Sequence, residues 1–149
     1  MQHLFDSYPF LLLAPMVFVW CVAGFLISQL TGWAALSRRF RATSLPPQQV
    51  WNFQTARMRW STRYGNCLTV GADPAGLYLC TFFLLRIGHP PLLLPWHEVS
   101  IRPRGKTLFG RRVQLQLGRE EQIPLTITGR LADRIQAAAG QKWPVEATT

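Results

Sequence analysis

One uninterrupted apolar stretch limits what this 149-residue chain can fold into. No charged side chain occurs between Ser7 and Ser37. Its central part, from Phe10 to Leu30, would form a helix about 30 Å long, which matches the hydrocarbon core of a membrane. A cleaved export signal carries its positive charges before the apolar run, whereas here they follow it. The pattern therefore predicts one transmembrane helix.

The charge distribution predicts the orientation of this helix. All 16 Lys and Arg residues lie at Arg38 or later, and the chain has a formal net charge of +9. Because Arg38, Arg39 and Arg41 follow the apolar run directly, the positive-inside rule places the C-terminal domain in the cytoplasm and the N-terminus outside. We expect Trp33 at the membrane interface and these three arginines beside anionic headgroups.

A change in periodicity marks the start of the folded domain. After Pro46 and Pro47 the apolar residues alternate with polar ones, which is typical of β-strands. The clearest case is the stretch from Val113 to Ile127, where the alternation predicts a hairpin with Leu117 opposite Ile123.

An earlier hairpin is expected around a turn centred on Asp73 and Pro74. This register would place Leu68 opposite Leu79 and Val70 opposite Leu77 on an aliphatic face. It would also place Cys67 opposite Cys80 on the other face, a position that permits a cross-strand disulfide. We expect both thiols to be reduced, because disulfides are rare in the cytoplasm.

The whole pattern predicts a mainly β domain of about seven short strands followed by one helix. Such a sheet curls into an antiparallel barrel of the pleckstrin-homology (PH) type, and the C-terminal helix closes one end. The expected organisation is an N-terminal tail at 1–8, the transmembrane helix and its interfacial end at 9–36, a basic linker at 37–47, the PH-like cytoplasmic domain at 48–140 and a flexible tail at 141–149.

Three short motifs lie in the region from Trp60 to Val99. They are Gly65-Asn66-Cys67-Leu68, Gly76-Leu77-Tyr78-Leu79, and Gly88-His89-Pro90-Pro91 leading into Pro95-Trp96. On these motifs the chain resembles small bacterial membrane proteins of uncharacterised function that carry one N-terminal helix and a PH-like or GRAM-like domain. The resemblance implies the fold and the topology. We expect the protein in the bacterial inner membrane. It implies no activity.

The sequence contains no recognisable catalytic constellation. It has no G-x-S-x-G elbow and no phosphate-binding loop of the P-loop type. His89 and His97 lack the spacing of zinc ligands, and only Glu98 lies near them as a further ligand. We therefore expect a protein that is not an enzyme and that binds neither a metal nor a cofactor.

Two surfaces are candidates for binding. Trp51 and Phe53 alternate with the inward residues of the first strand, so we expect them to be exposed beside arginines, as in many protein-docking sites. The second surface is a basic loop with an apolar tip at Leu108 and Phe109, which suits anionic lipid headgroups. Its cations are Arg102, Arg104, Lys106, Arg111 and Arg112.

These surfaces give two hypotheses for the function. The first is a membrane-anchored scaffold whose PH-like domain docks a protein partner of unknown identity. The alternative is an anionic-lipid-binding module that acts through the basic loop at 102–112. Nucleic acid is not an expected partner, because the domain is tethered to a membrane.

Overall fold

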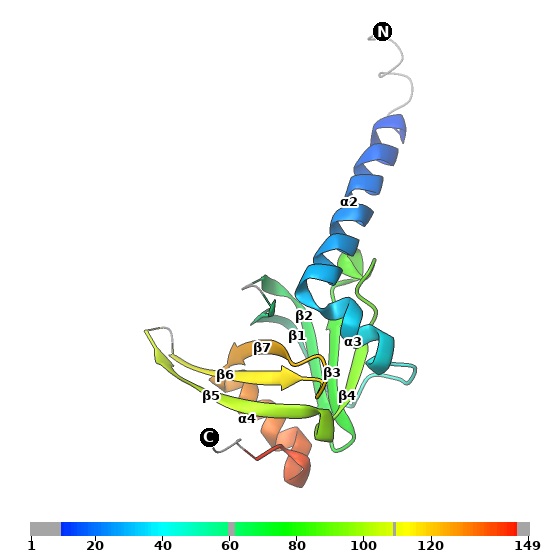
Figure 1. The fold of residues 1–149 in the computed structure, drawn as a ribbon. Helices are drawn as coiled ribbons and strands as arrows, with labels where there is room; N and C mark the ends of the chain where they lie inside the picture. The colour runs from blue at the N-terminus through cyan, green and yellow to red at the C-terminus, as the bar shows by residue number, and fades with distance from the viewer. Residues whose placement is uncertain (1–9, 60–61, 109, 146–149) are drawn as a thin grey trace.

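The N-terminal helix projects from the β domain, which contacts the C-terminal half of the helix. The computed structural model describes residues 10–59, 62–108 and 110–145. Helix α2 (Phe10–Thr31) rises from the domain, and most of its apolar side chains are exposed (Figure 1). It is long and apolar enough to cross a membrane.

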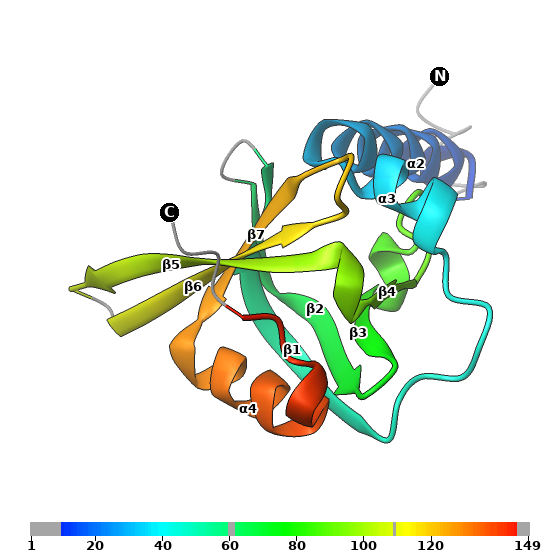
Figure 2. The ribbon, with the colours of Figure 1, turned by 60° about the horizontal axis from the view of Figure 1, so that its bottom comes forward.

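Seven antiparallel strands form one sheet that curls into a nearly closed barrel, which confirms the predicted fold class (Figure 2). The strand order is β4-β3-β2-β1-β7-β6-β5. In chain order the strands are β1 (Gln49–Arg57), β2 (Arg63–Asp73), β3 (Gly76–Thr81), β4 (Leu92–Pro95), β5 (Val99–Thr107), β6 (Gly110–Leu117) and β7 (Ile123–Thr128).

The register of β6 with β7 is the predicted one. Leu117 pairs with Ile123 and Leu115 with Leu125, and all four side chains are buried. The register is strongly determined because a one-residue slip would move this aliphatic set to the outer face.

The predicted register of β2 with β3 is wrong by two residues. Val70 pairs with Leu79, not Leu77, and Cys80 lies opposite Thr69, not Cys67. The reason is the turn, because Asp73 pairs with Gly76 and its carboxylate accepts hydrogen bonds from the N–H groups of Ala75 and Gly76. A shift of two residues leaves each side chain on the same face, so the core is preserved. Both cysteines are free thiols.

Two helices close the barrel from different sides. Helix α4 (Gly129–Ala139) follows β7 directly, and the Thr128 hydroxyl caps it by accepting a hydrogen bond from the Leu131 N–H. Leu131 and Ile135 are buried against the strands. Helix α3 (Trp33–Phe40) packs at β4, near the base of α2.

After α2 the chain does not follow the expected course, because α3 packs into the barrel. Trp33, Leu36 and Phe40 point into the barrel core, and the first two are fully inaccessible to solvent. Trp33 is therefore not an interfacial anchor, and the expected basic linker begins as a packed helix. The change of direction occurs at Gly32, whose φ of 85° lies in the left-handed region that glycine adopts readily.

We predict that Leu36→Ala destabilises the detergent-solubilised protein by about 2–5 kcal/mol, because it leaves a cavity in the core. Arg38→Ala on the exposed side of the same helix is the matched control, and we expect a change within about 0.5 kcal/mol there. Equilibrium unfolding followed by circular dichroism measures both. Equal, small effects would show that α3 is a linker and not part of the core.

Candidate functional site: an arginine-lined seam

Among the strands that pair in the barrel, β1 and β7 share the shortest register. The register of these strands contains one residue pair, Arg57 opposite Thr126. Strand β1 also has two register shifts, which flank Gln54 and bend the strand. A cavity of about 410 Å³ lies along this seam. We refer to this cavity and its lining residues as the seam.

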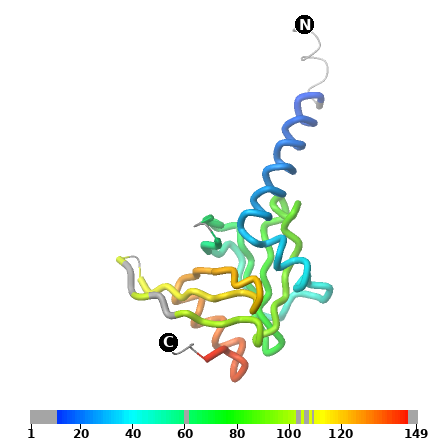
Figure 3. The backbone as a smooth tube through the Cα atoms, viewed as in Figure 1, coloured from blue at the N-terminus to red at the C-terminus, as the bar shows by residue number. Residues whose placement is uncertain are grey.

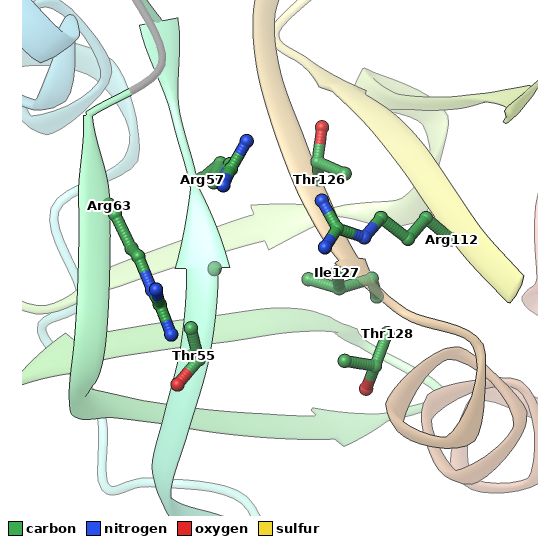
Figure 4. Close-up of a pocket in the computed structure, with 8 residues that line it drawn as sticks. Thr55, Arg57, Arg63, Arg112, Thr126, Ile127 and Thr128 are labelled. Carbon is green, nitrogen blue, oxygen red and sulfur yellow. The ribbon is translucent and has the colours of Figure 1, made fainter. Parts of the chain in front are cut away.

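Three arginines from three strands line the seam. Arg57 on β1 lies directly opposite Arg63 on β2, and Arg112 on β6 lies opposite Thr128 on β7. Figure 4 shows Arg57 and Arg63 on one side of the cavity and Arg112 reaching over β7 from the other side. The remaining polar lining consists of the side chains of Thr55, Thr126 and Thr128.

The carboxylates of the described residues do not balance the charges of the seam. Among the described residues, no Asp or Glu lies within ion-pair distance of Arg57, Arg63 or Arg112. Like charges directly opposite each other on a sheet are destabilising. Guanidinium groups and threonine hydroxyls together form a donor set that suits a carboxylate or phosphate. The seam therefore has the composition of an anion-binding site.

Other arginines of the barrel show the contrast. Arg39 on α3 makes ion pairs with Glu98, Glu120 and Glu121, so this predicted lipid-facing residue contacts protein carboxylates. Its hydrogen bond to Glu121 raises the pKa of the Arg39 guanidinium. Arg38 and Arg41 beside it are exposed.

The predicted basic loop is the β5–β6 hairpin, which extends to the side of the barrel away from α2 (Figures 1 and 2). Arg111 makes an ion pair with Asp133 on α4, and Arg112 belongs to the seam. Arg102 borders a separate cavity beside His97 and Arg119.

By register, Arg104 lies opposite Arg112 and Lys106 opposite Arg111. The side chains of Arg104 and Lys106, and the predicted apolar tip residue Phe109, lie outside the described part of the chain. Of the five predicted cations, Arg112 lines the seam.

The two predicted docking aromatics differ in exposure. Phe53 is exposed, and its φ of 55° places it in a bulge of β1. The expected exposure of Trp51 is wrong, because Trp51 pairs with the inward-facing Val70 and packs against the core. The bulge breaks the alternation on which the expectation relied. A docking role for either residue stays a prediction.

A second polar group lies at the junction of α2 and the barrel. The hydroxyl of Thr31 lies 3.1 Å from that of Tyr64, which lies 3.0 Å from Nε2 of His89. Nδ1 of His89 lies 3.5 Å from the carbonyl oxygen of Ile87. A carbonyl can only accept, so a proton on Nδ1 would face the Ile87 carbonyl and leave Nε2 to accept from the Tyr64 O–H. The Trp33 indole N–H donates to the Pro90 carbonyl at 2.9 Å beside it.

Burial sets the protonation of this junction. Desolvation lowers the pKa of His89 and raises the pKa of Tyr64 to about 12, so both side chains are neutral near pH 7. Within residues 10–59, 62–108 and 110–145, no three potential metal ligands gather at His89 or elsewhere.

No protein-family model matches the chain, and no curated protein matches it. The sequence did not single out Arg57 and Arg63 as a site, because they join Arg112 only through the β1–β7 contact. The available signal was the close spacing of the arginines at 57, 59 and 63.

We predict that His89 makes folding sensitive to acid. Because its folded-state pKa lies below the ordinary value of about 6.5, the unfolded chain binds the proton more tightly. The contribution of neutral His89 to folding stability is therefore present above about pH 6.5, and it is lost as the pH falls from that value toward the folded-state pKa.

Thermal melts between pH 7.5 and pH 5 test this prediction, and His89→Gln should lose less stability over this range than the wild-type protein. The control His97→Gln changes an exposed imidazole and should keep the wild-type slope. Equal slopes in all three proteins would contradict the role of His89.

Proposed function

We propose that this chain is a non-enzymatic, membrane-anchored binding protein whose PH-like domain docks an acidic segment of a protein partner. Helix α2 is the membrane anchor in this proposal, and the domain lies at the cytoplasmic surface of a bacterial inner membrane. The seam is the docking site. The observation that carries the proposal is the cavity with three arginines that lack carboxylate partners among the described residues.

The chemistry of the seam supports an acidic ligand. Arg57 on β1 and Arg63 on β2 are direct cross-strand partners. A bound carboxylate would relieve the repulsion between them and gain charge-assisted hydrogen bonds. The incomplete pairing of β1 with β7 leaves this part of the sheet open. An extended segment of a partner protein fits such an opening better than a compact ion does.

The charge asymmetry of the chain supports the anchor and its orientation. The 16 cations all follow the apolar helix, so the positive-inside rule favours a cytoplasmic domain. The resemblance to bacterial membrane proteins with PH-like or GRAM-like domains supports the same location.

The alternative function is an anionic-lipid module that uses the loop at 102–112. Its support is the local density of cations in the sequence. The β5–β6 hairpin extends from the side of the barrel away from α2, so it does not point toward the membrane that α2 would cross. We therefore rank docking through the seam first.

We predict that a peptide of ten glutamates raises the melting temperature of the detergent-solubilised protein. At a concentration about 100 times Kd, the ligand would contribute about 2.7 kcal/mol to stability. Replacing both Arg57 and Arg63 by Gln should abolish this shift, because it removes two of the three guanidinium donors. The wild-type shift should also shrink at high ionic strength.

The matched control replaces Arg130 and Arg134 of α4 by Gln, which removes the same charge from exposed positions elsewhere. This variant should keep the wild-type shift. An equal loss in both double variants would mean diffuse attraction to a basic surface and would contradict the seam. Stabilisation by phosphatidylglycerol nanodiscs with no effect of the peptide would favour the lipid alternative.

A further inference from the structure

The segment between β3 and β4 carries the densest group of exposed apolar side chains on the described barrel. Phe82, Phe83, Leu84 and Ile87 are each between 40% and 63% exposed. Elsewhere on the described barrel, exposed large apolar residues are fewer on each segment, for example Val50 and Phe53 on β1. A cluster of this kind on a soluble surface marks a contact with another apolar phase. We call residues 82–88 the apolar loop.

The apolar loop lies against the C-terminal half of α2 (Figures 1 and 3). The Trp20 indole N–H donates to the Leu84 carbonyl at 2.9 Å, and the Ser28 hydroxyl donates to the Gly88 carbonyl. A Cβ at Gly88 would lie 3.1 Å from the Phe25 Cα, so the two backbones are in close contact there. The loop is therefore held on the helix at several levels.

The position of Trp20 along α2 shows how deep the apolar loop would lie in a membrane. Trp20 lies eleven residues before the end of α2 at Thr31, which is about 16 Å along the axis. The hydrocarbon core is about 30 Å thick. If α2 spans this core, the apolar loop lies beside it within the same layer or at its boundary.

Several backbone groups of the loop are hydrogen-bonded within the protein. At the 3₁₀ turn Phe83–Leu85, the Leu85 N–H donates a hydrogen bond to the Phe82 carbonyl at 2.8 Å. The Leu84 and Gly88 carbonyls accept from side chains of α2. Such internal satisfaction is required of non-helical backbone at membrane depth.

The one charged residue of the loop, Arg86, is directed toward the barrel. Arg86 is exposed, and its guanidinium lies 3.6 Å from Sγ of Cys80 on β3, which places it toward the barrel. A long basic side chain can keep its charge at the interface while its neighbours enter lipid.

We propose that the apolar loop inserts into the lipid bilayer beside α2 and forms a second membrane contact of this protein. The occupant of its exposed face is lipid, at the level of the interface and the adjoining acyl chains. The inference rests on the proposed anchoring role of α2. It adds a loop from the β domain to a membrane contact that would otherwise consist of a single helix.

The test compares three phenylalanines of similar exposure, Phe18 on α2 (69%), Phe53 on β1 (67%) and Phe83 in the apolar loop (63%). Each is replaced in turn by the photoreactive analogue para-benzoylphenylalanine in the full chain. The proteins are reconstituted in vesicles of phosphatidylcholine and phosphatidylglycerol and irradiated. Mass spectrometry then measures the covalent lipid adducts. Because each change retains an aromatic ring at an exposed site, folding should be preserved, and circular dichroism checks it.

We expect lipid adducts at position 83 with a yield within a few-fold of that at position 18, and only background at position 53. Adducts at 18 without adducts at 83 would overturn the loop insertion and leave the anchor intact. Absence of adducts at both positions would overturn the anchor as well. Crosslinking of position 83 to a second copy of the chain, without lipid, would assign the loop to a protein contact and also overturn the proposal.

Discussion

The burial of α3 in the barrel is the constraint on which the arrangement of this protein depends. Trp33 and Leu36 are fully buried among residues of several strands, so the chain that leaves α2 continues directly into the core. Gly32 makes this possible, because its positive φ turns the chain and a Cβ there would collide with the Ile123 side chain. Helix α2 and the domain are therefore one packed unit, in contrast to a domain on a flexible tether.

The polar contacts at the junction reinforce this unit. Ser28 and Thr31 are buried although they lie on an apolar helix, and each has a hydrogen-bond partner in the barrel or its loop. Buried hydroxyls without partners would be costly, so these bonds restrict the positions that the helix can take relative to the strands. The neutral imidazole of His89 completes the group and makes it sensitive to protonation.

The sequence was sufficient for the fold class and for the β6–β7 register, because period-two alternation on both strands leaves one register that buries Leu115 and Leu125. It was not sufficient for the β2–β3 register, since a shift of two residues keeps the same faces and only the turn chemistry at Asp73 decides. The expected position of Trp33 at the membrane interface was wrong for a different reason. An apolar stripe with flanking arginines suits a lipid surface and a protein core equally well. The seam depends on contacts between residues far apart in sequence, and no local pattern contains that information.

The two proposals together explain why a single-span protein would need an apolar loop. One helix in a bilayer leaves its domain free to rotate about the helix axis and to tilt with it. The proposed second contact, held on α2 by Trp20 and Ser28, would remove much of that freedom. The seam would then face a constant direction relative to the membrane surface. A docking site presented in this way loses less orientational freedom when a membrane-bound partner binds, and this lower entropic cost increases affinity without any additional contact in the seam.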